Sequence, residues 1–529
     1  MHWYDFRSRL ALDLQHETDR RQFGLNQSVA VSVFVLLTAA SLLPVLLTPI
    51  PAMVDYVNHL TRMYILSQNA SADANPYYEV AWALYPNLAM DLLIPQMARL
   101  ISVENAARLF LLLSQILIIG GALALERVVK GRMHLAGGFA ALMFLYCLPF
   151  SWGFVNFEFG LGVALWGISG YLLAAERAWP IRFIVNAVFV TALFAAHFFA
   201  LGIYGATLGL YEVWRAYDRR APYRDVVLRL VLLTIPVLAL LELMRLTAGS
   251  IGGEGSSWFF EFKPIWLFRI MNGYNLTVSA ASSLVLLALL YFAIKHRALK
   301  LEPAGIWLAT GFAFLYLAIP SKLLGTSFSD LRIIPAAALI LPAFCTLSLP
   351  GRRWTITALA AVSGITLANL AVTYSVWLPY RTDYAAIIAS FQKIDRGSKI
   401  LVGVSGEDED PPFRDLTRYP MFYAPTLAVH YVDALVPNLF TAVGKQPVQA
   451  RAPVRRLAIP YGGPVPLGVL TAIAAGQPPS DVPPFISTWP RDYGYLYVLG
   501  PRTANPLPDL LEELEASPRF VLYKIRQAR

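Results

Sequence analysis

The chain has 529 residues, of which 57% are hydrophobic and only 15% are charged. A soluble globular chain carries about 25% charged residues, so the composition excludes an ordinary soluble protein. The net charge of +9 does not predict nucleic-acid binding, because the basic residues lie in short loops between apolar runs, as in the cytoplasmic loops of multi-span proteins. With only two cysteines, Cys147 and Cys345, a disulfide framework and a cysteine metal site are also excluded.

Apolar segments recur along the first 380 residues, and a helix needs roughly 20 apolar residues to cross a bilayer. We therefore predict a mainly α fold, a polytopic transmembrane helical bundle of about eleven spans, followed by a C-terminal α/β extracytoplasmic domain. The predicted parts are a cytoplasmic N-terminal segment (1–27), a transmembrane domain (28–380) and a periplasmic domain (381–529). The predicted spans are 28–50, 105–126, 134–151, 158–176, two within 181–214, 225–245, 274–294, 304–320, 332–350 and 355–376.

Two segments are ambiguous in this topology. Residues 84–101 are apolar but contain Asp91 and Arg99, and 181–214 is long for one crossing and tight for two. If 84–101 does not span and 181–214 crosses twice, every basic loop falls inside. We prefer that version, which puts the N-terminus in the cytoplasm and the C-terminal domain in the periplasm of a bacterial cell inner membrane.

Alternating patterns after residue 380 predict the α/β domain. Residues 383–394 have the pattern of an amphipathic helix and 507–516 that of an acidic helix. The short apolar runs 399–404, 494–500 and 520–525 are predicted strands.

The first outer loop carries the first candidate for catalysis. Asp55 and His59 are four residues apart, so a helix beginning here presents both on one face. A carboxylate at a membrane edge is well placed to take a proton from a hydroxyl. With His59 it could also hold a divalent cation, Mg or Mn. The simpler explanation, favoured by spacing alone, is that Asp55 caps the helix.

Polar groups follow the third predicted span and interrupt a later one. Asn156 and Glu158 lie in the segment GFVNFEFG, and His197 interrupts a long apolar run. An ionisable group within a membrane segment is a candidate functional residue. The alternatives are an interfacial position for Glu158 and, for His197, a neutral histidine paired with a neighbouring helix.

A late outer loop, PSKLLGTSFSDLR, contains Lys322 and Arg332. Arginine binds phosphate through two parallel hydrogen bonds, and lysine acts as a mobile point charge. Basic residues outside run against the inside bias, which makes them notable. The simpler explanation is an ion pair of either residue with Asp330.

Together, the architecture, Asp55 in DYVNH, the Asn156 segment with His197, and the Lys322–Arg332 loop resemble the GT-C superfamily of polytopic membrane glycosyltransferases. The resemblance implies a polyprenyl-phosphate-linked sugar donor, a lipid or glycan acceptor, and Asp55 as the catalytic base. It further implies that Lys322 and Arg332 hold the donor phosphate. The first outer loop lacks a DxD motif and a paired Asp-Glu, and the WWD-type motif of oligosaccharyltransferases is absent, which disfavours sequon recognition and makes a cation secondary.

Three other classes of function fit parts of the pattern. A lipid-linked sugar transporter or flippase would need polar groups at the bilayer midplane and often shows an internal repeat. A glycan polymerase or ligase would depend on the arginine loop and not on Asp55. A scaffold would use the outer domain to bind a partner.

Overall fold

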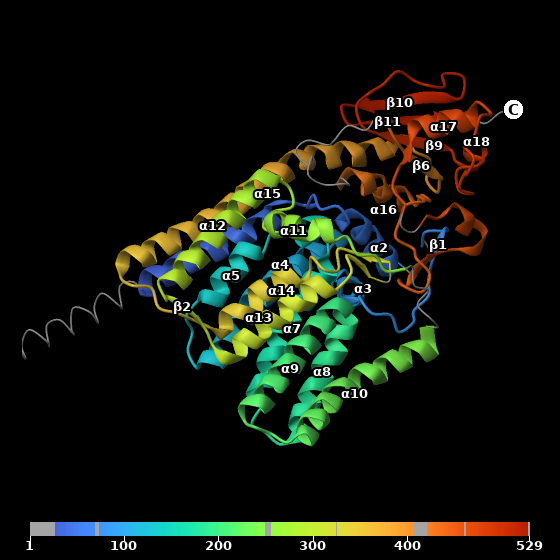
Figure 1. Cartoon of the computed structure of the whole chain (residues 1–529). Coiled ribbons are helices and arrows are strands. Elements are labelled where there is room, and N and C mark those ends of the chain that lie inside the picture. The colour runs from blue at the N-terminus through green and yellow to red at the C-terminus, as the bar shows by residue number, and fades with distance from the viewer. Residues whose placement is uncertain are drawn as a thin grey trace, which may run out of the picture.

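The computed structural model describes residues 27–68, 74–248, 255–323, 325–405, 420–459 and 462–526. It is a bundle of helices with a small sheet at one end, as Figure 1 shows, so the predicted mainly α class with a C-terminal α/β region is confirmed. The predicted segment 1–27 lies outside the described residues except for Gln27.

Helix occupies most of each predicted span, but 134–151 is interrupted between two helices and 332–350 ends in the short strand Cys345–Leu347. The helices of the bundle are Gln27–Leu47, α4 (Val103–Lys130), α5 (Ala136–Phe144), α6 (Leu148–Trp152), α7 (Val155–Leu173), α8 (Trp179–Ala196), α9 (Phe198–Asp218), α10 (Tyr223–Ala248), α12 (Leu276–Lys295), α13 (Pro303–Ala318), α14 (Ile333–Ile340) and α15 (Arg352–Ser390). Within the described ranges, six of them are long and apolar enough to cross a membrane: Gln27–Leu47, α4, α8, α10, α12 and α15. The total number of crossings stays a prediction.

The structure favours the preferred version of both ambiguous segments. Residues 84–101 contain only the nine-residue helix α3 (Ala89–Met97), about 14 Å long and too short to span. Residues 181–214 divide into α8 and α9 at His197, whose backbone is extended. Asn87 supports this break, because its Oδ1 accepts a hydrogen bond from the Phe198 N–H at 2.7 Å.

Short elements form an outer layer at the end of the bundle that carries the sheet. They are α2 (Tyr56–Gln68), β1 (Tyr78–Val80), the 3-10 turn η1 (Phe260–Phe262), α11 (Lys263–Arg269), β3 (Lys322–Leu323) and β4 (Thr326–Ser327). A second small sheet, β2 (Leu299–Leu301) with β5 (Cys345–Leu347), joins the α12–α13 connection to the chain after the 3-10 turn η2 (Leu341–Phe344).

The C-terminal sheet has five strands in the order β10-β11-β9-β6-β8. They are β6 (Ile400–Val404), β8 (Val465–Pro466), β9 (Tyr495–Leu499), β10 (Leu511–Ser517) and β11 (Phe520–Ile525). β6 runs parallel to β8 and β9, and β9, β11 and β10 are successively antiparallel. The three predicted strands are present. The predicted acidic helix over 507–516 is wrong, because most of that segment is β10, whose pairing with β11 overrides its helical propensity.

The rest of the C-terminal region consists of short helices and one small strand pair. The helical pieces are η3 (Phe391–Lys393), η4 (Pro420–Leu427), α16 (Ala428–Val432), η5 (Ala452–Leu457), α17 (Leu467–Ala474) and α18 (Trp489–Asp492). The strand β7 (Val448–Ala450) pairs antiparallel with β1 of the first outer loop.

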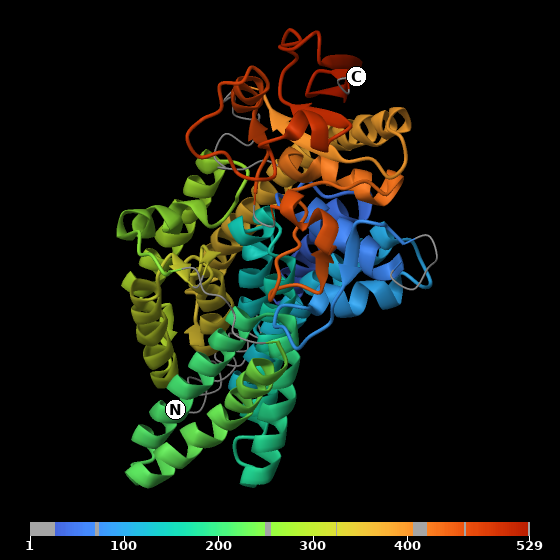
Figure 2. The same cartoon turned by 90° about the vertical axis from the view of Figure 1, so that its right-hand side faces the viewer.

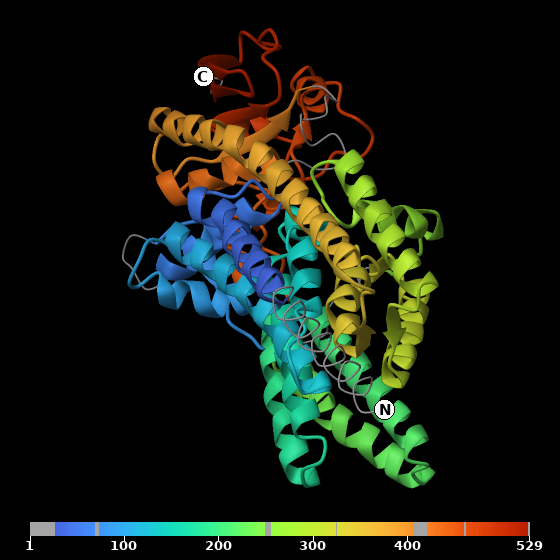
Figure 3. The same cartoon turned by 90° about the vertical axis from the view of Figure 1, so that its left-hand side faces the viewer.

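This region packs on the first outer loop, and Figures 2 and 3 show the two side by side. Asn58 of α2 uses both atoms of its side-chain amide for the contact. Its Nδ2 donates to the Asn438 carbonyl at 2.8 Å, and its Oδ1 accepts from the Phe440 N–H at 2.7 Å. The C-terminal region therefore covers the helix that begins directly after Asp55.

One helix, α15, joins the bundle to the sheet without a break. Its 39 residues make about 58 Å of helix, and the predicted boundary at 380/381 falls inside it. Near its end, Asp383 pairs with Arg519 at 2.6 Å and the Ser390 hydroxyl lies 3.0 Å from the Tyr497 hydroxyl. The predicted last span and the predicted helix over 383–394 are thus parts of one helix.

Candidate active site

Asp55 occupies the residue just before α2 and is half-buried. Its carbonyl accepts a hydrogen bond from the His59 N–H at 3.0 Å, and its own N–H donates to the Trp152 carbonyl at 3.0 Å. The residue therefore sits at a helix N-terminus, which favours a negative charge. This position is compatible with the predicted base and with the simpler capping role.

The turn between α6 and α7 fixes the backbone of Asp55. Gly153 in that turn has φ +84°, and a Cβ there would lie 3.0 Å from the Tyr56 nitrogen and 3.1 Å from the Asp55 nitrogen. Any other side chain would push against the start of α2. Glycine is required both for the left-handed backbone and for this close approach.

Arg332 directly precedes α14 and is buried. Its guanidinium carbon lies 4.5 Å from the ring centre of Phe154, 5.4 Å from that of Phe157 and 5.6 Å from that of Phe199. Its Nη2 reaches the Ser327 carbonyl at 3.5 Å, whereas Nε and Nη1 are buried with no hydrogen-bond partner. Buried donors are normally satisfied, so this guanidinium has capacity to bind a ligand.

Two acidic side chains lie close enough to interact with Arg332. The Asp55 carboxylate stabilises its charge electrostatically, and Glu158 lies within range of the same guanidinium. Glu158 is buried in the first turn of α7 and accepts a hydrogen bond from the Cys147 thiol, with an Sγ–Oε1 distance of 3.7 Å. The structure thus brings Asp55, Glu158 and Arg332 into one electrostatic neighbourhood.

His197 belongs to the same neighbourhood. Its Nδ1 accepts a hydrogen bond from the Phe199 N–H at 3.1 Å, and its ring packs edge-on against Phe157. The charge of Arg332 also acts on the His197 ring. The bond caps α9, the helix that begins directly after His197, and is therefore not the predicted alternative of a pairing with a neighbouring helix.

The loop before Arg332 is held by a buried ion pair. Lys263 of α11 donates to Asp330 at 2.9 Å, and the Ser321 hydroxyl donates to the same carboxylate oxygen at 2.7 Å. Lys263 also donates to the carbonyls of Tyr316 and Ile319. The predicted simpler explanation for Arg332, a pair with Asp330, is therefore wrong, because Lys263 binds that carboxylate.

Lys322 lies in β3, which forms a hairpin with β4. Its backbone also bridges to Ser257, with Ser257 N–H donating to the Lys322 carbonyl at 2.8 Å and the Lys322 N–H donating back at 3.0 Å. Between this hairpin and Arg332 lies Phe328, whose ring packs against Trp152 and Trp266. The hairpin and Arg332 therefore belong to one short loop, which packs through Phe328 against two tryptophan rings.

His59 and Asn156 contact protein groups instead of joining this neighbourhood directly. The His59 ring packs on Phe440, and its Nδ1 lies 3.2 Å from Nη1 of Arg62. Burial, with the Arg62 charge as the second cause, lowers the pKa of His59 to about 3. Asn156 donates to the Asn87 carbonyl at 2.6 Å and accepts from the Met90 N–H at 2.9 Å, so it fixes the start of α3.

Sequence reasoning missed two buried ion pairs near the site. Arg62 of α2 donates to Asp91 of α3 and joins the two outer helices, and Lys263 binds Asp330 as described above. A signal existed for the first pair, because Asp91 is an ionisable residue in an apolar segment. Neither partner could be chosen from spacing, since 29 and 67 residues separate the members of the two pairs.

The expected divalent cation, Mg or Mn, does not fit the residues around Asp55. Among the described residues, no three His, Cys, Asp or Glu side chains gather into a candidate metal site. The His59 Nδ1 lies 3.2 Å from the Arg62 guanidinium, and Asp55 shares its surroundings with Arg332. Both guanidinium groups would repel a cation.

Comparison with known proteins finds structural likeness only. No family model matches the chain, and no curated protein matches it in sequence. Two solved structures of ArnT from Cupriavidus metallidurans are similar in the course of the chain. The one bound to undecaprenyl phosphate has a TM-score of 0.49 and 14% identity, covering 94% of this chain and 98% of that one. The apo form has a TM-score of 0.45 and 13% identity, covering 96% and 98%.

The likeness to these two structures concerns the overall path of the chain, and neither of them assigns a role to a residue of this one. What the chain itself shows is a membrane-type helical bundle with an outer sheet. At the junction of the two, a half-buried carboxylate and a buried, partly unbonded guanidinium share one electrostatic neighbourhood.

Proposed function

We propose that this chain is an integral membrane glycosyltransferase of the GT-C type, which moves a sugar from a polyprenyl-phosphate donor to an acceptor hydroxyl on the periplasmic side. The observation that carries the proposal is Arg332, a buried guanidinium with two unbonded nitrogens whose charge interacts with Asp55. The polyprenyl carrier follows from the family resemblance in the sequence.

In the proposed reaction Asp55 acts as the base. The acceptor hydroxyl gives its proton to the Asp55 carboxylate as its oxygen bonds to the anomeric carbon. The bond from that carbon to the donor phosphate oxygen breaks, and its electron pair stays on the polyprenyl phosphate. A single displacement inverts the configuration at the anomeric carbon.

Arg332 stabilises the leaving group in this scheme. Its Nε and Nη1 would donate to the phosphate oxygen on which charge develops, with Lys322 as a second positive charge. The surrounding rings of Phe154, Phe157 and Phe199 exclude water and hold the guanidinium in place. The release of polyprenyl phosphate then returns the site to its starting state once Asp55 loses its proton.

The proposal is tested with the variant Asp55→Asn in purified, lipid-reconstituted protein. A panel of undecaprenyl-phosphate-linked sugars serves as donor, and undecaprenyl phosphate alone serves as the binding probe. We expect transfer to fall by at least about 100-fold, since general-base catalysis contributes 10²–10⁴-fold, while binding of the probe is retained. The exposed Asp509→Asn is the matched control.

Two outcomes contradict the proposal. Transfer by Asp55→Asn at the rate of the control removes the base assignment and favours a polymerase or ligase that depends on the arginine loop. Movement of intact lipid-linked sugar across the vesicle membrane, without transfer in the wild type, identifies a flippase instead.

A further inference from the structure

A second charged cluster lies at the opposite end of the bundle from the C-terminal sheet. Helices α7 to α10 are consecutive, and at this end α7 and α9 finish while α8 and α10 begin, in the lower part of Figure 2. At the centre of the cluster is Glu212 of α9, whose side chain is fully buried.

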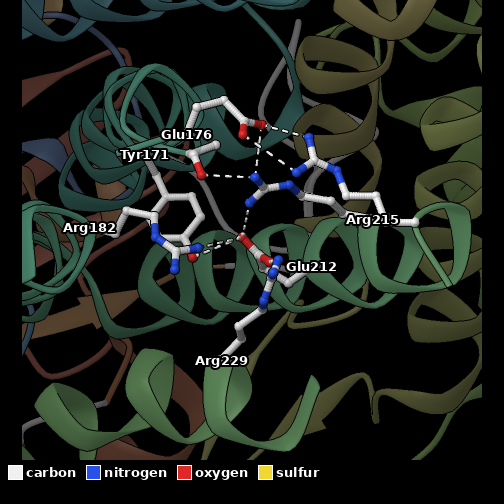
Figure 4. A network of polar contacts seen from close by, with 8 residues as sticks. Tyr171, Glu176, Arg182, Glu212, Arg215 and Arg229 are labelled. Atoms are coloured by element: carbon white, nitrogen blue, oxygen red, sulfur yellow. Dashed lines mark hydrogen bonds and ion pairs between the residues drawn. The ribbon is translucent and has the colours of Figure 1, made fainter. Parts of the chain in front are cut away.

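Three arginines surround the single carboxylate of Glu212, as Figure 4 shows. Arg229 lies 2.9 Å from its Oε2, and Arg215 and Arg182 lie 3.4 Å and 3.8 Å from its Oε1. The Tyr171 hydroxyl donates to Oε1 at 3.0 Å. One carboxylate therefore faces three guanidinium groups from α8, α9 and α10.

The cluster has more positive than negative charge. Glu176 joins it from the α7–α8 turn and bonds Arg215 at 2.8 Å and Arg219 at 2.7 Å. The four arginines are thus opposed by two glutamates, which leaves an excess of two positive charges. Arg182 and Arg229 are mostly buried, with side-chain exposures of 17% and 22%, and the Arg182 Nε has no hydrogen-bond partner. Uncompensated charge away from water is costly, so the cluster favours an anion.

A pocket opens beside this excess charge. It is lined by residues of α7, α8 and α10, among them Tyr171, Trp179, Arg182, Asn186 and Arg229. Another pocket at the same end, around Lys130 and Arg132, is also lined by Glu302, and Lys130 is already paired with Glu126. Charge is balanced there, so it offers no comparable attraction.

The surroundings place the pocket at the edge of the lipid. Trp179 is 58% exposed at the start of α8, where amphipathic aromatic rings mark a membrane interface. Further along α8, the Ile184 side chain is 60% exposed, and on the neighbouring α10 Leu238 is 61% exposed, as expected for side chains that face lipid tails. An anion held by Arg182 and Arg229 would therefore lie at the level of the lipid headgroups.

We propose that this pocket binds the phosphate headgroup of an anionic phospholipid from the leaflet opposite the C-terminal sheet. Arg182 and Arg229 contact the phosphate oxygens, and Glu212 holds the three guanidinium groups together. Basic pockets between membrane helices are known to recognise such headgroups. The proposal is independent of the reaction at Asp55.

The test compares wild type and Arg182→Gln in nanodiscs of phosphatidylglycerol and of phosphatidylcholine, with bound lipid measured by native mass spectrometry and stability by thermal melting. We expect the wild type to retain phosphatidylglycerol and to melt at a higher temperature in it. The variant should retain it on the order of fivefold less. Arg245→Gln is the control, because Arg245 is exposed and paired with Glu242 on the same α10.

A second variant separates lipid binding from a purely structural network. Arg182→Lys keeps the positive charge beside Glu212, so it should retain more phosphatidylglycerol than Arg182→Gln. Equal retention by wild type and Arg182→Gln overturns the proposal. Equal stabilisation of the wild type by inorganic phosphate in phosphatidylcholine discs also overturns it, since the site would then bind a free anion.

Discussion

Lys263 and Asp330 form an ion pair at 2.9 Å, and both side chains are almost fully buried. The pair connects α11 to the loop that ends in Arg332. The position of the Arg332 guanidinium therefore depends on a contact between two residues that are 67 positions apart in the sequence.

Replacing Lys263 with Met should destabilise the protein by about 3–5 kcal/mol, because Asp330 would remain buried without a countercharge. Thermal melting in detergent checks the stability, and undecaprenyl phosphate binding checks the position of Arg332. The double variant Lys263→Met with Asp330→Asn should recover part of both. A double variant as impaired as the single one would show that the pair does not position the loop.

Replacing Arg332 with Ala should weaken undecaprenyl phosphate binding by about 10- to 150-fold, the worth of hydrogen bonds to a charged group. Arg332→Lys should recover only part of the affinity, because it keeps the charge and loses the planar pair of donors. Titration of the probe in nanodiscs measures this, with exposed Arg245→Ala as control. Unchanged affinity in Arg332→Ala at an unchanged melting temperature would exclude the phosphate role.

Replacing Gly153 with Ala should lower turnover on the order of 10- to 100-fold, because a Cβ at this position displaces the backbone of Asp55. Gly131→Ala is a matched control, since Gly131 also has a left-handed backbone (φ +72°) but no atom within 4 Å of an added Cβ. Both variants carry the cost of a left-handed non-glycine residue, about 1–2 kcal/mol. Only the first should lose turnover beyond its loss of stability, and equal effects would contradict the positioning of Asp55 by this turn.

His59 should make the protein sensitive to acid. Its pKa is lowered to about 3 in the folded state, against about 6.5 in an unfolded chain. The unfolded state therefore takes up the proton first, so stability is full above about pH 6.5 and falls as the pH drops toward 3, by up to about 1.4 kcal/mol per pH unit. Melting temperatures of wild type and His59→Asn between pH 7.5 and 5 test this.

The His59→Asn variant should show a shallower decline with acid than the wild type. His296→Asn, which changes an exposed histidine, is the control and should follow the wild type. Parallel curves for all three proteins would show that the protonation of His59 is not coupled to folding.

The sequence alone was enough to predict the helical bundle, because membrane helices satisfy their own backbone and need long apolar runs. It also predicted two helices within 181–214, since the basic loops had to lie on one side, but the position of the break, at His197, came only from the structure. The segment Leu511–Ser517 shows the limit. Its acidic helical pattern is local, whereas its strand conformation comes from pairing with Phe520–Ile525.

The sequence also predicted only part of the candidate site, namely the charged and titratable residues but not the groups that hold them. Asp55, Glu158, His197 and Arg332 are individually conspicuous as charged or titratable groups near membrane segments, and the structure brings them together electrostatically. The partners that hold them are not conspicuous. Gly153 and Lys263 act through close approaches and long-range pairs, which depend on the packing of helices that spacing in the sequence does not determine.

The continuity of α15 links the rotation of the C-terminal sheet to that of the bundle. A helix turns by about 100° and rises 1.5 Å for each residue, so a single alanine inserted after Thr373 would turn the sheet through more than a quarter of a circle. The strand pair β1–β7 and the bond from Asn58 to the Asn438 carbonyl hold the C-terminal region on the first outer loop. The inserted residue would rotate that region, so these contacts and the continuous helix could not both be kept. The number of residues in α15 between the bundle and the sheet therefore determines the orientation of the sheet on the bundle, and insertions or deletions should be tolerated best when they add or remove about a full helical turn.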